Sequence, residues 1–106
     1  MNGQVDHLAW LMSWYASQCD GDWEHSYGLK IETLDNPGWI LTVDLTGTTL
    51  ESALFQDHAE GIEDRDTPLA RWNVCRVRQQ TFEGFGGPFD LEAIIACFRR
   101  WAESSN

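Results

Sequence analysis

Three carboxylates alternate along one short stretch of the chain, at Asp20, Asp22 and Glu24. Alternating carboxylates are typical of the start of a calcium-binding loop, because hard cations prefer oxygen ligands. Such a loop also needs glycine at its sixth position and glutamate at its twelfth, where this chain has His25 and Ile31. We therefore predict a solvated acidic turn and no metal site.

Histidine and cysteine are the other side chains that could support catalysis or bind a metal. They stand at His7, Cys19, His25, His58, Cys75 and Cys97, and no pair has the spacing of a zinc site. An odd number of widely spaced cysteines is typical of free thiols in a reducing compartment, and we expect them to be buried and inert. His25 falls on the apolar row of an expected strand, which predicts a hydrogen-bonded residue at the core edge. No catalytic set is predicted.

A glycine-rich stretch, Gly84-Phe85-Gly86-Gly87, lies between an expected strand and an expected helix, where phosphate-binding loops are found. It has neither the G-x-G-x-x-G spacing of a dinucleotide site nor the lysine of a P-loop. Asp90 follows at the place where a phosphate would need the helix N-terminus. We therefore expect a flexible structural hinge and no cofactor.

Charge narrows the class of partner. The chain has 106 residues, typical of one domain over residues 1–106, and its formal net charge is −10. Residues 1–64 carry twelve acidic residues and one lysine, net −11, whereas residues 65–106 are net +1. Phosphate binding needs clustered basic side chains, so this field argues against nucleic acid and anionic membranes and favours a basic partner. Because no basic segment precedes an apolar run at the N-terminus, a cytoplasmic location is the default expectation.

The acidic stretch must be positioned by the elements around it. An apolar stripe predicts a helix over residues 6–19, formed by Leu8, Leu11, Met12, Tyr15 and Cys19. Period-two alternation predicts a strand over residues 23–33 and another from residue 39, joined by the turn residues 35–38. The two apolar faces coincide in one register, which pairs Thr33 with Trp39, Ile31 with Leu41, Leu29 with Val43 and Tyr27 with Leu45.

The second half of the chain is expected to continue the sheet and to close it with a helix. We expect a short strand near residues 49–55, a solvated loop over residues 56–70 and a strand over residues 72–82. Arg76 and Arg78 on that strand could pair with Glu32 or Asp44. Asp90 is expected to cap a final helix, whose apolar stripe is Leu91, Ile94, Ile95, Phe98 and Trp101. The predicted fold is α+β: an antiparallel sheet of about four strands with an N-terminal and a C-terminal helix on one face.

Several strings carry a family resemblance along nearly the whole chain. They are Leu11-Met12-Ser13-Trp14-Tyr15, Cys19-Asp20-Gly21-Asp22-Trp23-Glu24-His25, Tyr27-Gly28, Ile31-Glu32-Thr33-Leu34-Asp35-Asn36-Pro37-Gly38-Trp39, Phe82-Glu83-Gly84, Gly87-Pro88 and the closing helix to Trp101. On these residues the chain resembles the immunity protein 53 family of bacterial polymorphic toxin systems. The resemblance implies a small cytoplasmic protein that binds and neutralises a toxin, protecting the cell that produces it.

We therefore predict a binding protein, not an enzyme, that neutralises a cognate toxin by covering a basic active site such as that of a nuclease. Carboxylates would there take the place of substrate phosphates. The expected partner-binding residues are Asp20, Asp22, Glu24 and Asp35, with Trp39 as an aromatic anchor. Two alternatives stay open: a small enzyme using His25, and a ligand-binding or dimerisation module. Either a monomer or a dimer is compatible with the sequence.

Overall fold

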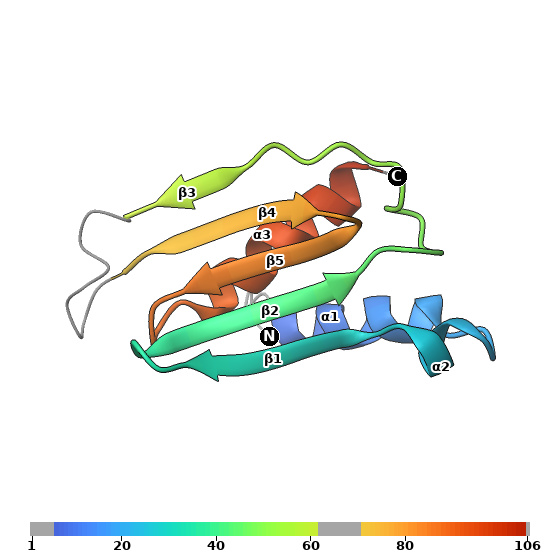
Figure 1. The fold of residues 1–106 in the computed structure, drawn as a ribbon, viewed down its shortest axis with the longest axis horizontal. Helices are drawn as coiled ribbons and strands as arrows, with labels where there is room; N and C mark the ends of the chain where they lie inside the picture. Colours follow the sequence, from blue (N-terminus) through green and yellow to red (C-terminus); the bar gives the residue numbers. More distant parts are fainter. Residues whose placement is uncertain (1–5, 62–70, 106) are drawn as a thin grey trace.

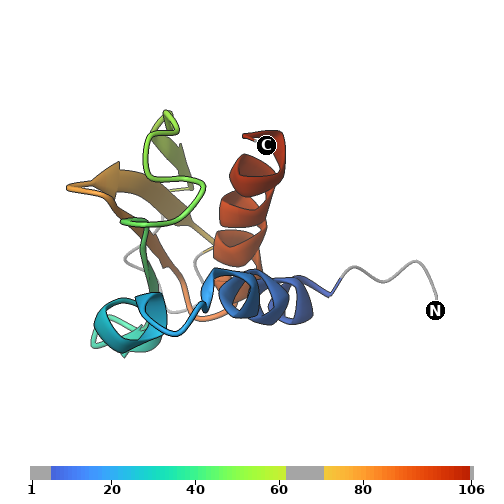
Figure 2. The same cartoon turned by 90° about the vertical axis from the view of Figure 1, so that its right-hand side faces the viewer.

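The computed structural model describes residues 6–61 and 71–105. Two helices cover one face of an antiparallel sheet, giving two layers (Figures 1 and 2). The elements in chain order are α1 His7–Gln18, α2 Trp23–Ser26, β1 Leu29–Leu34, β2 Gly38–Asp44, β3 His58–Glu60, β4 Asn73–Arg78, β5 Thr81–Gly86 and α3 Leu91–Ser104. The strand order is β1-β2-β5-β4-β3. The predicted α+β class is confirmed, with a five-stranded sheet in place of about four strands.

The β1–β2 hairpin has the register that its apolar pattern predicts. Thr33 lies opposite Trp39, Ile31 opposite Leu41 and Leu29 opposite Val43. Tyr27 does not reach the sheet, because it is the C-cap of α2. The pairing of the two strands ends instead at Gly28 and Asp44. The Asp44 N–H donates to the Gly28 carbonyl at 2.9 Å, and the Gly28 N–H donates to Asp44 Oδ2 at 3.0 Å.

The connection after β2 differs from the expected strand over residues 49–55. Consecutive turns occupy this segment: the Thr48 N–H donates to the Leu45 carbonyl, the Thr48 carbonyl accepts from Glu51, and the Leu50 carbonyl accepts from Ala53. The strand lies later, at β3, inside residues 56–70, which were expected to form a loop. The rest of that expected loop, residues 62–70, lies outside the described residues.

The expected single strand over residues 72–82 is two strands, β4 and β5, joined at Gln79 and Gln80. Both glutamines have positive φ, 52° and 61°, as a two-residue primed hairpin turn requires. The arginines of β4 also have partners other than those expected. Arg76 pairs with Glu83 and Arg78 with Asp57, both at 2.7 Å, instead of with Glu32 or Asp44.

The glycine-rich stretch is a strand, not a hinge. Gly84 and Gly86 lie in β5, directly beneath α3. A Cβ on Gly84 would lie 2.4 Å from Ile94 Cγ2, and one on Gly86 would lie 2.9 Å from Ile94 Cδ1. The missing side chains therefore let α3 approach the sheet. The predicted α3 stripe is confirmed in the core, where Ile94, Ile95, Phe98 and Trp101 are buried and Leu91 is partly buried.

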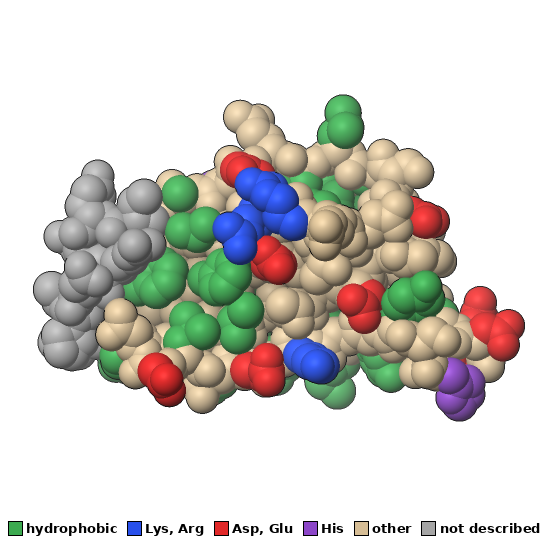
Figure 3. All heavy atoms as spheres, viewed as in Figure 1, with side chains coloured by type: hydrophobic (Ala, Val, Ile, Leu, Met, Phe, Trp, Pro, Cys, Tyr) green, Lys and Arg blue, Asp and Glu red, His purple; other side chains and the backbone are tan. Residues whose placement is uncertain are grey.

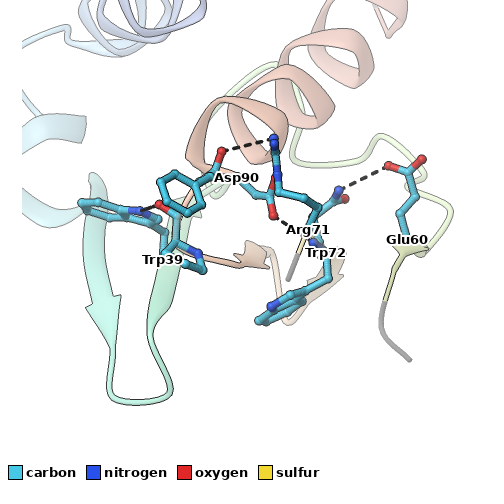
Figure 4. A network of polar contacts seen from close by, with 8 residues as sticks. Trp39, Glu60, Arg71, Trp72 and Asp90 are labelled. Atoms are coloured by element: carbon cyan, nitrogen blue, oxygen red, sulfur yellow. Dashed lines mark hydrogen bonds and ion pairs between the residues drawn. The ribbon is translucent and has the colours of Figure 1, made fainter. Parts of the chain in front are cut away.

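The start of α3 is joined to the start of β4 by a buried carboxylate (Figure 4). Asp90 occupies the predicted N-cap position, but its side chain makes no capping hydrogen bond. Its oxygens accept instead from Arg71 Nε at 2.7 Å and from the Trp72 N–H at 2.8 Å. The side chain is 4% exposed, so this contact replaces solvent for the carboxylate and fixes the end of the helix against the sheet.

Helix α1 begins as predicted but buries only part of its predicted apolar face. Asp6 is its N-cap, and its side chain accepts a hydrogen bond from the Ala9 N–H at 2.9 Å. Leu11 and Trp14 are the buried residues, whereas Leu8, Met12 and Tyr15 of the expected stripe are exposed. The reason is that α1 packs chiefly on α3, which itself covers β2, β4 and β5. Within the described residues, no helix is long and apolar enough to cross a membrane.

Candidate functional site

The acidic stretch forms a loop that its own side chains hold closed. Asp20 Oδ1 accepts from the N–H groups of Asp22 and Trp23, both at 3.0 Å. The Glu24 carboxylate reaches back and accepts from the Asp20 N–H at 3.0 Å and the Gly21 N–H at 2.9 Å. The chain turns at Gly21, whose φ of +97° favours glycine. Two of the three carboxylates therefore order the loop that carries them.

These hydrogen bonds explain why a helical turn stands where alternation predicted a strand. Residues 23–26 form α2, with Asp22 at the N-cap. Asp20 and Glu24 bond in the reciprocal manner of a capping box, satisfying backbone donors around the helix start. The strand prediction for residues 23–28 was wrong because this local side-chain chemistry outweighs a period-two pattern.

Backbone hydrogen bonds in this loop lower the pKa of two carboxyl groups. Hydrogen bonds from the backbone of Trp23, and then of Asp22, lower the pKa of Asp20. The pKa of Glu24 is also lowered, first by its own backbone N–H and then by the N–H groups of Asp20 and Gly21. Asp22 lies between them, exposed and without a side-chain capping bond. The loop thus presents a fixed negative charge with one carboxylate free for contact.

Trp23 anchors this loop to the body of the protein. Its side chain is 5% exposed and its indole Nε1 donates to the Thr46 carbonyl at 2.8 Å. Its ring packs on Trp14 and Tyr15 of α1, with centroid separations of 6.4 Å and 5.9 Å. The tryptophan therefore joins α1, α2 and the turn that follows β2, which limits movement of the adjacent carboxylates.

The other two expected partner-binding residues lie at the opposite end of the hairpin. Asp35 is exposed in the β1–β2 turn, and β1 separates it from α2 by roughly 20 Å at ~3.3 Å per residue. Trp39 begins β2 and is partly buried against the core, and its Nε1 donates to the Pro88 carbonyl at 3.0 Å (Figure 4). The structure thus groups Asp20, Asp22 and Glu24 and leaves this pair apart.

Acidic and basic side chains lie on different parts of the surface. Figure 3 shows carboxylates at the α2 end and along the edge that β1 forms, while arginine side chains gather over β4. In the sequence, residues 6–44 hold seven acidic residues against one lysine, Lys30. The edge of the protein from α2 to the β1–β2 turn is therefore strongly negative, which would speed encounter with a basic surface.

The described structure brings together two cysteines and one histidine that lie far apart in the sequence: His58 lies opposite Cys75 in the β3–β4 ladder, and a hydrogen bond with Cys75 lowers the pKa of Cys97 to about 7. His25 is exposed at the end of α2, so its expected place at the core edge was wrong. All three thiols are free, and Cys75 and Cys97 are buried as expected, whereas Cys19 is partly exposed. A hydrogen bond with Cys97 and burial raise the pKa of Cys75, which disfavours its thiolate. No group of three or more His, Cys, Asp or Glu in residues 6–61 and 71–105 is arranged to hold a metal ion.

Sequence reasoning missed one set of surface residues beside the acidic loop. Leu8, Met12 and Tyr15 of α1 and Tyr27 after α2 are 49%, 63%, 38% and 41% exposed. The signal was present, because α1 carries a second apolar row, Trp10 and Trp14, in addition to the predicted stripe. Two apolar rows on one short helix exceed the single face that a two-layer fold buries.

The fold and the loop define a small acidic α+β domain that presents rigidly held carboxylates at one edge. The sequence model of the immunity protein 53 family matches residues 8–103. The chain therefore belongs to this family, and the membership predicted from its motif strings is confirmed. No curated protein and no solved structure matches the chain.

Proposed function

We propose that this immunity protein neutralises a cognate bacterial toxin by laying the acidic loop, Asp20 to Glu24, over a basic active site such as that of a nuclease. The observation that carries the proposal is the pair of carboxylates fixed by four backbone hydrogen bonds, two to Asp20 and two to Glu24. A charged surface that is already ordered loses little conformational entropy when a partner binds.

Electrostatics supports the same assignment. Backbone hydrogen bonds lower the pKa values of Asp20 and Glu24, so both stay ionised to a lower pH than free carboxyl groups do, and Asp22 adds a third carboxylate in the same loop. Carboxylate oxygens can occupy the places of substrate phosphates among lysine and arginine side chains. This loop would therefore act by occlusion and without chemistry of its own, as a binding protein rather than an enzyme.

Co-expression tests the proposal. The product of the gene adjacent to the gene for this protein is expressed with the wild-type chain, and growth and complex formation are measured. We expect restored growth and a stable complex whose association slows as salt rises. The proposal is overturned if the two proteins form no complex and the cells are not rescued. It also fails if a substoichiometric amount of this protein inactivates the toxin by cleaving or modifying it.

A further inference from the structure

A groove separates α1 from β1 at the edge of the molecule. It measures about 660 Å³ and is lined by Leu8, Leu11, Met12, Tyr15, Tyr27, Gly28, Leu29 and Ile31. Both elements lie at the same side of their layers, α1 with the helices and β1 at the outer edge of the sheet (Figures 1 and 2). The helix does not close this gap, since it packs chiefly on α3.

One wall of the groove is an open strand edge. Within residues 6–61 and 71–105, β1 pairs with β2 on one side and ends the strand order on the other. The Asp44 N–H donates to the Gly28 carbonyl, so position 28 is hydrogen-bonded to β2. Pairing alternates along an antiparallel ladder, which directs the backbone N–H and carbonyl groups of Leu29, Ile31 and Thr33 to the open side. These groups can pair with another extended chain.

The other wall supplies apolar contacts to such a chain. Leu8, Met12 and Tyr15 recur at helical spacing along α1 and stay exposed. A strand added beside β1 would point alternate side chains toward the helix layer, onto this row. Apolar side chains there would cover the exposed leucine and methionine, which are unfavourable in water.

Charge identifies the kind of partner. The acidic loop lies at one end of the groove and Asp35 at the turn that ends β1, while Lys30 is the one lysine or arginine between residues 6 and 44. A second copy of this chain would bring like charges together at this edge. A small ligand would meet a lining whose side chains are all uncharged, with few groups to orient it. A basic protein segment suits both the charge and the apolar floor.

We propose that the groove binds an extended segment of the toxin, an inference that rests on the proposed function. Apolar side chains alternate along this segment, and Lys or Arg residues lie at its two ends. The segment pairs with the open edge of β1, its apolar residues lie against α1, and its basic ends meet the acidic loop and the β1–β2 turn. The groove thereby supplies binding energy beside the loop that covers the active site.

The test compares the double variant Leu8→Ala/Met12→Ala with Leu54→Ala in binding to the purified toxin. Leu54 is 94% exposed and lies outside the groove, so it controls for loss of an exposed apolar side chain. We expect the double variant to keep its circular dichroism spectrum and to bind about tenfold or more weakly. The control should bind within about twofold of wild type.

Amide hydrogen exchange in the complex supplies the second measurement. The N–H groups of Leu29, Ile31 and Thr33 should exchange more slowly when toxin is bound, while those of β3, at the other sheet edge, should not change. If wild type binds the toxin and the double variant binds it equally well, the groove proposal is overturned. The same holds if toxin binding leaves amide exchange along β1 unchanged. Either result leaves the proposed function standing. Absence of any toxin complex overturns both. A wild-type dimer that Leu8→Ala/Met12→Ala converts to monomer assigns the groove to a second copy and also overturns the proposal.

Discussion

The carboxylate of Asp90 accepts a hydrogen bond from the backbone N–H of Trp72 at 2.8 Å, joining two segments that are 18 residues apart. Asp90, the N-cap of α3, thus holds the start of that helix against the two residues that precede β4, and Arg71 Nε completes the contact at 2.7 Å. The site depends on this junction indirectly, because α3 is the surface on which α1 packs.

Removal of the Asp90 carboxylate should destabilise the fold. Asp90→Ala leaves the buried Trp72 N–H without an acceptor, and we expect the free energy of unfolding to fall by about 1–3 kcal/mol. Asp90→Asn keeps an acceptor oxygen for Trp72 and should lose less. Urea denaturation of both variants measures the difference. Equal stability of Asp90→Ala and wild type would contradict the role given to this contact.

Alanine should be costly at one glycine and nearly neutral at another, because Gly84 lies beneath α3 and Gly28 has open space around it. A Cβ on Gly84 would lie 2.4 Å from Ile94 Cγ2, so Gly84→Ala should cost about 1–3 kcal/mol through overpacking. A Cβ on Gly28 would meet no atom within 4 Å, and Gly28→Ala should change the free energy of unfolding by less than about 0.5 kcal/mol. Thermal unfolding of the two variants measures this difference. Equal melting temperatures for the two variants would contradict the prediction.

The β4–β5 turn offers a stabilising substitution. Gln79 and Gln80 have positive φ, a conformation that asparagine tolerates better than glutamine. Gln80 also accepts from Thr46 Oγ1 at 2.7 Å through its side chain, so Gln79 is the residue to change. We expect Gln79→Asn to raise the free energy of unfolding by about 0.5–1 kcal/mol. Gln56→Asn, at an exposed coil position without positive φ, serves as the control and should give no gain.

The register of the β1–β2 hairpin was predictable because it places apolar side chains opposite each other in two facing pairs, Ile31 with Leu41 and Leu29 with Val43. The β4–β5 turn was not, since glutamine has no turn preference and the sequence across it reads as one alternating run. Gly84 and Gly86 suggested flexibility, yet they lie in β5 because Ile94 occupies the space of their side chains. That contact is tertiary and leaves no local pattern.

The structure of the acidic loop could also be predicted only in part from the sequence. Its charge and its turn were evident from sequence, but alternation concealed the capping contacts of Asp20 and Glu24, which turn residues 23–26 into helix. The apolar row of α1 was evident from the sequence, but its exposure was not. Periodicity shows that a helix has an apolar face, and only the packing of α1 on α3 decides which face is buried.

Acidification should loosen the loop. The pKa of Asp20 is lowered in the folded protein by the N–H groups of Trp23 and Asp22. A lowered folded pKa contributes stability above the ordinary carboxyl pKa of about 4, and this is lost as pH falls through the lower value. We expect the pH dependence of unfolding below pH ~4 to weaken in Asp20→Asn. Asp35→Asn, which alters an exposed turn carboxylate, is the comparison, and identical profiles for Asp20→Asn and wild type would contradict the assignment.

The central claim, that the acidic loop meets a basic toxin surface, is tested most directly by the association rate as a function of salt. Asp22→Lys is the informative variant, because Asp20 and Glu24 hold the loop whereas Asp22 makes no side-chain capping bond. Glu92→Lys makes the same charge change on the exposed first turn of α3. We predict that Asp22→Lys slows association about three- to tenfold at low salt and flattens the salt dependence, while Glu92→Lys does neither. Equal association rates and salt slopes for Asp22→Lys and wild type would contradict the account.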